Sequence, residues 1–358
     1  MPNTGGLALR ETDTERQWPV ATPQNMNLDA HFRAIDPEGY VRKHLQAGVH
    51  VDGDGDGQRR KLSEMRATSL QTAGATTVVC GVMAELCQPM EEHPERGLLV
   101  IHAELSAGVL VNDREAAMQR LQLTTATLDD LNQSDALIDR KCLLIEHGQL
   151  AWALYCDVHF VQYDGAFLDT SLLALVAALK STKLPVVTLP VADISAEANM
   201  LPDNVPFSRV RPLAERKALR KLKPKIDANQ LISVADAVNV YSGTTFAFYQ
   251  VERCINAATD DAATEEKAAI EPQWLVDPTE DELTWLPSTL SIVHGPSETE
   301  LRALHRHSWT AATGQALLPL HERTLSECLA ASQKRWLQVK CLLEQAITIR
   351  KGNERRKL

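Results

Sequence analysis

The first candidate site is an acidic, glycine-rich stretch in the N-terminal part of the chain. Asp52, Asp54 and Asp56 alternate with glycines, as in the first half of a calcium-binding loop. Such a loop needs a glutamate at its twelfth position, but that position is Ser63, and the glutamate follows one residue late at Glu64. Three consecutive basic residues in the same stretch would repel a cation. We therefore expect a solvated acidic loop, and because its glycines neither follow a clear strand nor open a helix, we expect no nucleotide site.

The second candidate is a pair of histidines near the C-terminal helix. The spacing of His305 and His307 places both on one side of a strand, where they could begin a metal site if carboxylates converged on them. No third ligand is evident nearby, so a surface or packing pair is the main interpretation. The chain has no Gly-x-Ser-x-Gly nucleophile motif. Its seven cysteines form no Cys-x-x-Cys pair and read as reduced core thiols. These residues alone do not indicate an enzyme or a bound cofactor.

The third candidate is a basic block between Phe207 and Lys225. It holds eight lysines and arginines against one glutamate, a local charge of +7. Such a block could neutralise several phosphates of RNA in a salt-dependent way. The candidate RNA-binding residues are Arg209, Arg211, Arg216, Lys217, Arg220 and Lys221. No aromatic residue that could stack on bases lies between Arg209 and Lys225, so a solvated or partner-binding surface remains the alternative.

Length and composition limit the kind of protein that carries these residues. A chain of 358 residues suits two domains, and 44% hydrophobic with 23% charged residues is typical of a folded, globular protein. The net charge of −10 argues against a free-standing protein that holds nucleic acid by overall basicity. There is neither a membrane-length apolar stretch nor a basic-then-apolar start, so we expect no membrane association and a location in the cytosol or nucleus.

The first half of the chain has the pattern of an α/β layer. The sequence predicts a short helix, two strands that share a sheet, and a capped helix, at residues 29–46, 76–86, 98–105 and 112–137. Next come a strand at 142–145, a long strand at 150–162, a turn at Tyr163-Asp164-Gly165, and an apolar helix from Thr170 to Lys180 that ends before Pro185. A strand, a tight turn and a buried helix form the basic unit of such a layer.

The second half repeats this architecture on a smaller scale. Strand-like runs lie at 244–249, 274–279 and 288–293, and a long helix with an apolar stripe from Leu325 to Ile347 ends the chain. We therefore expect an α/β fold of two sheet-plus-helix layers. The predicted organisation is a flexible arm (1–28), a first domain (29–190), an inserted basic segment (191–243), and a second domain (244–358) with an acidic insertion at 255–273 and a C-terminal helix.

The unit around the long strand resembles the RNase PH-like ring subunits of the eukaryotic RNA exosome. The resemblance rests on the run from Gly148 to Asp157, on the Tyr163-Asp164-Gly165 turn, and on the helix end from Leu173 to Lys180. Three further runs match: Arg60, Glu64 and Arg66; Thr77 to Val82; and Leu275 to Thr279. Together the matches span most of residues 40–345 outside the insertion, and they imply an RNase PH-like fold.

Two departures from the phosphorolytic members of this family concern the active site. Those members follow the Asp-Gly turn with residues that hold phosphate, but here Ala166, Phe167, Leu168 and Asp169 follow, and these would exclude an anion. Catalytic members also carry two aspartates six residues apart. Asp281 fits the first position, whereas the second is a proline, Pro287, which can neither donate a proton nor help to bind magnesium. The family's arginine-bearing RNA loop also looks shortened between Ser106 and Arg114.

The resemblance therefore implies a non-catalytic ring subunit. Its expected partners are other RNase PH-like subunits, cap subunits with S1 and KH domains, and a separate exoribonuclease that receives RNA through the ring channel. Its expected location is the nucleus and nucleolus, and also the cytoplasm. Three alternatives stay open: a sister non-catalytic ring subunit, an active phosphorolytic 3'-5' exoribonuclease, and a stand-alone RNA-binding protein.

Overall fold

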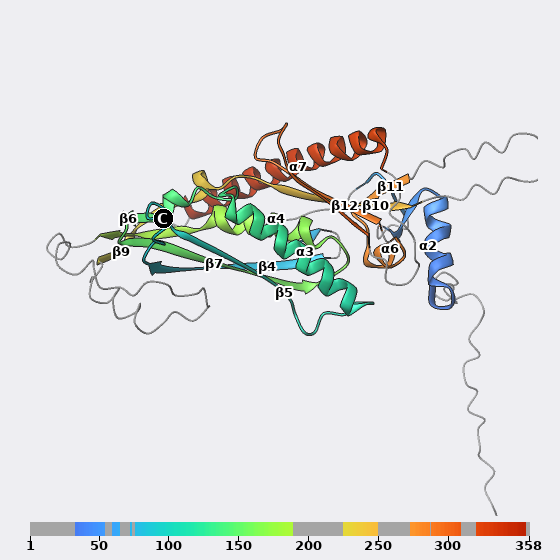
Figure 1. Ribbon diagram of the computed structural model, residues 1–358, viewed down its shortest axis with the longest axis horizontal. Coiled ribbons are helices and arrows are strands. Elements are labelled where there is room, and N and C mark those ends of the chain that lie inside the picture. Colours follow the sequence, from blue (N-terminus) through green and yellow to red (C-terminus); the bar gives the residue numbers. More distant parts are fainter. Residues whose placement is uncertain are drawn as a thin grey trace, which may run out of the picture.

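The computed structural model describes residues 33–53, 59–64, 72–73, 76–188, 225–249, 273–286, 288–308 and 320–355. The predicted N-terminal arm, the candidate RNA-binding arginines and lysines of the basic block, and Pro287 lie outside these residues. In the described part, two sheets enclose a helical layer, and a long C-terminal helix covers the outer face of the second sheet (Figure 1). The predicted α/β architecture is confirmed.

The first sheet has β7 at its centre. Its strands are β3 (Thr72–Ala73), β4 (Thr76–Cys87), β7 (Leu150–Gln162) and β5 (Leu98–Leu105), in that order, and β6 (Leu144–Glu146) also pairs with β7. The two predicted strands 76–86 and 98–105 do share this sheet, but β7 lies between them, antiparallel to β4 and parallel to β5. Apolar side chains on alternate positions, such as Val78, Val158 and Phe160, are buried on one face.

The second sheet is antiparallel throughout. Its order is β11 (Gln273–Val276), β10 (Ser242–Tyr249), β12 (Ser288–His294) and β13 (Leu301–Ser308). The strands predicted at 244–249 and 288–293 are confirmed, whereas the strand predicted at 274–279 is too long. It ends at Val276 because Asp277 has a φ of 55° and Thr279 caps the next helix, α6 (Glu280–Trp285).

Two helices lie against the first sheet. Asp113 caps α3 (Arg114–Gln133) by accepting a hydrogen bond from the Ala116 N–H, as its sequence indicates. The second helix, α4 (Phe167–Ser181), packs on β4 on one side and on β10 on the other, which explains why its sequence is apolar almost all round. This helix begins three residues earlier than predicted, at the turn itself.

The C-terminal helix is α7 (Glu322–Arg355), as the apolar stripe predicts. It covers the face of the second sheet that points away from α4, and it runs along the top of the view in Figure 1. Its buried residues Trp336, Val339 and Leu343 reach the central part of the molecule. The Trp336 indole donates a hydrogen bond to the Val240 carbonyl at 2.9 Å, which joins the helix to the chain just before β10.

Two local predictions are corrected, and one boundary is refined. Residues Arg140–Leu143 form a 3-10 helix rather than the start of a strand. Pro185 lies within β8 (Lys183–Thr188), which pairs with β9 (Lys225–Ser233), so Pro185 does not directly end α4. Val234 and Val238, from the end of the predicted insertion, belong to the main hydrophobic core. The division into domains otherwise stays a prediction.

The remaining elements cover one end of the second sheet. They are α2 (Pro37–Gln46), β1 (Val49–Gly53) and β2 (Arg59–Lys61), and they share a small core with β10 and β11. No helix within the described ranges is long and apolar enough to cross a membrane. The described cysteines are all free; Cys87, Cys156 and Cys328 are buried, as expected of core thiols, whereas Cys142 and Cys341 are exposed.

Candidate functional site

The turn between β7 and α4 is locked to the start of α6. The Thr76 hydroxyl accepts a hydrogen bond from the Asp164 N–H at 2.9 Å and donates one to the Gly165 carbonyl at 3.1 Å. The Asp164 carboxylate in turn accepts the Glu280 N–H at 3.1 Å. Gly165 has a φ of 91°, and a Cβ added there would lie 2.1 Å from the Pro278 carbonyl oxygen. The turn therefore brings residues far apart in sequence into contact.

Apolar side chains occupy the N-terminal end of α4. Phe167 and Leu168 are only 3% and 5% exposed. The Phe167 ring stacks on Tyr163 with 4.1 Å between centroids and meets Phe160 edge-on at 4.7 Å. Anion sites at helix ends rely on accessible N–H groups and positive charge, whereas the first turn of α4 carries two buried apolar side chains and a carboxylate, Asp169. None of these three side chains offers a phosphate a hydrogen-bond donor or a positive charge.

Asp281, in the first turn of α6, is engaged by neighbouring side chains. Its carboxylate accepts a hydrogen bond from the Asn112 amide at 2.8 Å and forms an ion pair with Arg33. The Asn112 N–H donates to the neighbouring Glu280 carboxylate at 2.5 Å. These contacts tie α6 to the segment that leads into α3. Pro287, the other position of the pair, is not among the described residues, so its placement stays a prediction.

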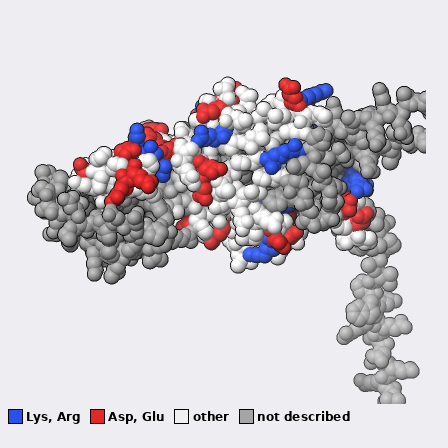
Figure 2. Space-filling model, in the orientation of Figure 1, with Lys and Arg blue, Asp and Glu red and all other residues white. Residues whose placement is uncertain are grey.

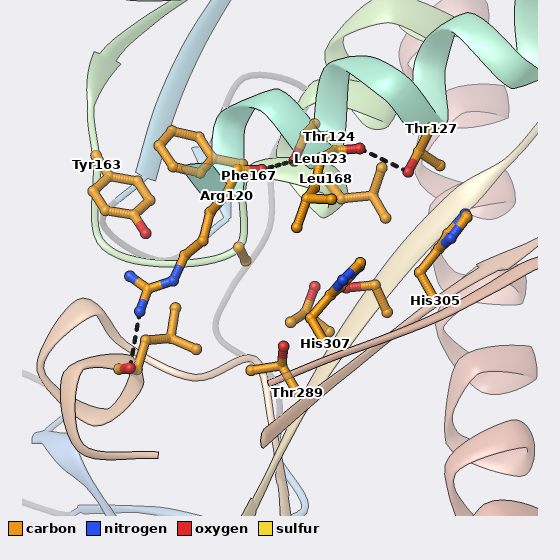
Figure 3. A pocket seen from close by; sticks show the side chains of 14 residues that line it. Arg120, Leu123, Thr124, Thr127, Tyr163, Phe167, Leu168, Thr289, His305 and His307 are labelled. Carbon is orange, nitrogen blue, oxygen red and sulfur yellow. Dashed lines mark hydrogen bonds between the residues drawn. The ribbon is translucent and has the colours of Figure 1, made fainter. Parts of the chain in front are cut away.

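A pocket opens between α3, the start of α4 and the inner face of the second sheet (Figure 3). Arg120 lies at one end, beside Tyr163, and donates to the Leu283 carbonyl at 2.9 Å. Burial raises the pKa of Tyr163 to about 12, so the phenol is neutral. The other residues that line the pocket are Leu123, Thr124, Thr127, Ala166, Phe167, Leu168, Thr245, Leu283, Thr289, Ser291, His305 and His307. The pocket is lined by hydroxyls and imidazoles and contains no carboxylate among its described lining residues.

Asp169 joins α4 to the second sheet from a buried position. One carboxylate oxygen accepts the Thr245 N–H at 3.0 Å, and the other accepts the Thr245 hydroxyl at 2.9 Å. Burial, together with the negative charge of Asp277, raises the pKa of Asp169 from 3.8 to about 6, although Thr245 and Arg335 oppose the shift. The folded chain therefore takes up a proton at this group at higher pH than the unfolded chain.

We expect this group to make the chain more stable in mild acid. The proton bound at Asp169 stabilises the folded state. This stabilisation is fully present below pH 4, falls as the pH rises through 6, and is absent above. The free energy of unfolding changes by about 3 kcal/mol between these limits. Asp169→Asn should remove this dependence, so its stability relative to the original chain should rise between pH 4 and 7 in urea denaturation.

A matched control is Glu104→Gln. The Glu104 carboxylate is exposed, and hydrogen bonding and charge from His102 and His159 hold its pKa below the usual value, so any pH effect has the opposite sign. If the free energy of unfolding of Asp169→Asn depends on pH in the same way as that of the original chain, the pH dependence does not come from Asp169.

A second buried polar group joins β1 to α6. Both Glu282 oxygens lie 3.0 Å from the His50 Nδ1, and they also accept the N–H groups of Val51 and Thr279, each at 2.9 Å. Thr279 and Glu282 form a reciprocal capping box. Burial would raise the pKa of Glu282, but its hydrogen bonds with His50 and with the backbone hold it below the usual value. The Thr-x-x-Glu spacing indicates the cap, but no sequence signal indicates the contact with His50.

The same group contains ligands that suit a metal ion. The ligand atoms of His50, Asp52 and Glu282 lie within 4.8 Å of one another. However, Arg60 already bonds to Asp52 at 3.2 Å, and the Glu282 carboxylate already contacts His50 and accepts two backbone N–H groups. The described geometry therefore suits a structural latch better than a cation site. Asp52, a residue of the calcium-like acidic stretch, belongs to this latch, while Asp54 and Asp56 lie outside the described residues.

The family comparison agrees with this geometry. Residues 61–185 match the model of the 3' exoribonuclease family, domain 1. Over 88% of its length, the chain superposes on a chain of an archaeal exosome core structure with a TM-score of 0.52 and 21% identity, covering that chain completely; this likeness shows the fold. The chain thus has an RNase PH-like fold, and residues 61–185 are similar to the first domain of that family.

The most informative sequence relatives are exosome components. The chain is 32% identical over 162 residues to Exosome complex component rrp43 of Schizosaccharomyces pombe, covering 43% of this chain and 60% of that protein. It is 30% identical over 155 residues to Rrp42 of Archaeoglobus fulgidus, covering 41% and 60% respectively. It is also 32% identical over 157 residues to RRP45 of Saccharomyces cerevisiae, covering 42% and 51%. These alignments span about half to three fifths of the relatives, and the chain is a homologue of exosome components.

Proposed function

We propose that this chain is a non-catalytic subunit of the RNA exosome core ring. In this role it helps to form the channel that threads RNA to a separate 3'-5' exoribonuclease, in the nucleus, the nucleolus and the cytoplasm. The observation that carries the proposal is the aromatic filling at the start of α4, where Phe167 packs between Tyr163 and Phe160. A subunit that supplies shape rather than chemistry needs no phosphate site at this turn.

The open face of the first sheet supports a ring role. Val79, Met83 and Val161 are 47%, 54% and 54% exposed, on the face opposite α3 and α4. Exposed apolar side chains on a sheet are costly unless a partner covers them.

Figure 2 shows acidic and basic side chains interspersed on the visible face, without a continuous basic stripe over the described residues. This surface suits protein neighbours better than a long nucleic-acid contact.

The first test is enzymatic and uses the purified chain. We expect no release of nucleoside diphosphates from single-stranded RNA in the presence of phosphate, and no tail synthesis from nucleoside diphosphates, because Phe167 and Leu168 occupy the expected phosphate position. An active phosphorolytic exosome is the positive control. Phosphate-dependent release by this chain, lost in Phe167→Asp, would favour the alternative of an active exoribonuclease.

The same preparation tests partnership. A tagged chain should copurify with RNase PH-like, S1 and KH proteins, and native mass spectrometry should give a ring-sized mass. A stable interface should bury at least about 1,000 Å². A monodisperse monomer whose melting temperature does not rise when candidate neighbours are added would contradict the proposal. The neighbours that are captured would separate this chain from a sister non-catalytic subunit.

We also expect the basic block to be peripheral to assembly. Replacing Arg216, Lys217, Arg220 and Lys221 with serine should leave the ring intact on size exclusion, and should at most weaken RNA binding, most strongly at low salt. The expectation rests on the local charge of the block and on its place outside the family pattern. If the quadruple variant loses its partners, the block has a structural role instead.

A further inference from the structure

The open face of the first sheet has a gap at Gly81. This glycine lies on the open face between Val79 and Met83 of β4, whose side chains are 47% and 54% exposed. A Cβ added at Gly81 would meet no atom within 4 Å, and the φ of this residue lies outside the left-handed region. Neither packing nor backbone conformation therefore requires a glycine here, and its missing side chain leaves a gap between two exposed apolar side chains.

The gap is also open at the side of the sheet. The short strand β3 pairs with β4 only at Thr76 and Thr77. Beyond Thr77, no strand within the described ranges pairs with this edge of β4. A side chain from another molecule can therefore reach Gly81 both from above the sheet and from its edge.

Acidic side chains lie beside the gap. Asp157 of β7 is the cross-strand partner of Gly81, and His102 of β5 follows in the same row. In the next row, Glu104 of β5 lies opposite His159 of β7. The Glu104 carboxylate lies 2.8 Å from the His159 Nδ1 and 3.3 Å from the His102 Nε2. A hydrogen bond from His102, and then the neighbouring His159, lower the pKa of Glu104, so this carboxylate is charged at neutral pH.

The open face carries no lysine or arginine to balance these acids. At the described positions of β4, β5 and β7 that point to this side, the charged residues are Glu85, Glu104 and Asp157. The apolar and aromatic residues around them are Val79, Met83, Leu98, Val100, Tyr155 and Val161. Such a surface is complementary to a protein surface that is largely apolar and brings its own cation. It would repel the phosphates of RNA.

We propose that a neighbouring ring subunit binds this face by inserting one arginine side chain over Gly81. The aliphatic stem of the arginine fills the gap between Val79 and Met83, and the guanidinium pairs with Asp157, whose charge Glu104 reinforces. Arginine suits this place because its stem covers apolar surface while its planar head binds a carboxylate through two hydrogen bonds. Arginine is also enriched at protein interfaces, whereas lysine is depleted. The inference rests on the ring role proposed above and names the contact by which the neighbour is held.

The first test fills the gap. The neighbour that copurifies with the tagged original chain is isolated, and its affinity for each variant of the full chain is measured by biolayer interferometry. Gly81→Leu should weaken binding at least tenfold, because the leucine takes the place of the arginine stem, and Gly81→Ala should have a smaller effect. The control is Gly108→Leu, in the turn after β5, where an added Cβ also meets no atom within 4 Å. It should bind as the original chain does, and thermal melting of each variant alone should show an intact fold.

The second test removes the charge without changing the size of the side chain. Asp157→Asn should weaken binding at least tenfold and should make the remaining affinity less dependent on salt concentration. Glu104→Gln should have a smaller effect of the same kind. Glu92→Gln, an exposed carboxylate in the turn after β4, is the matched control and should change neither quantity. An unchanged salt dependence in Asp157→Asn would show that this residue does not pair with a cation of the neighbour.

The outcomes separate the inference from the ring role. If the original chain captures no RNase PH-like neighbour, the ring role fails, and the arginine contact fails with it. If a neighbour binds the original chain, but binds Gly81→Leu and Asp157→Asn as tightly, the ring role stands and the arginine contact is overturned.

Discussion

Replacing Glu282 with alanine should destabilise the chain by about 3–5 kcal/mol. Glu282 is fully buried, and its removal leaves the His50 Nδ1 and the N–H groups of Val51 and Thr279 without their acceptor. A buried donor that loses its only partner carries the full cost of desolvation. The loss is measured as a lower midpoint in urea denaturation, with the slope unchanged.

Two further variants define the cause. Glu282→Gln should lower the midpoint of urea denaturation by an intermediate amount. Its amide oxygen still accepts a hydrogen bond, while its amide nitrogen faces other donors. Glu104→Ala removes a carboxylate that also meets a histidine, but on the exposed sheet face, and it should shift the midpoint far less. If Glu282→Ala is no more harmful than Glu104→Ala, the latch between β1 and α6 contributes little to stability.

Gly165→Ala should cost about 2–5 kcal/mol, from two separate effects. The positive φ of 91° disfavours any side chain, and the new Cβ would lie 2.1 Å from the Pro278 carbonyl oxygen. Because that contact is with backbone, the turn and α6 must separate. We expect a lower melting temperature and a loss of the contact between Asp164 and the Glu280 N–H, visible as faster exchange of that amide hydrogen.

Gly148→Ala separates these two effects. Gly148 also has a positive φ, of 68°, but no atom lies within 4 Å of its added Cβ. This variant should show only the backbone cost of about 1–2 kcal/mol. Equal losses of stability in the two variants would mean that the close approach of the turn to α6 adds nothing to the cost of Gly165→Ala.

Much of the fold follows from local patterns in the sequence. The alternation of apolar residues along β4 and β7, the Asp113 cap of α3 and the long stripe of α7 depend on periodicity and capping, which act over a few residues. The all-round apolar sequence of α4 indicates burial on every side. At the start of that helix, the residue types of Phe167 and Leu168 predict a position unsuited to phosphate, because neither side chain can donate a hydrogen bond or carry positive charge.

The tertiary structure decided what those patterns leave open. The order of strands, with β7 between β4 and β5, is set by how the sheet closes on its helices, and no local signal encodes it. The latch between His50 and Glu282 joins residues 232 positions apart, and Asp169 meets Thr245 across 76. Likewise, the spacing of His305 and His307 predicts a shared face, but only the packing of α3 and α4 makes that face the wall of a pocket. Such contacts depend on burial and on the packing of segments that are distant in sequence. The residue types of the site could therefore be read from the sequence, whereas their arrangement in space could not.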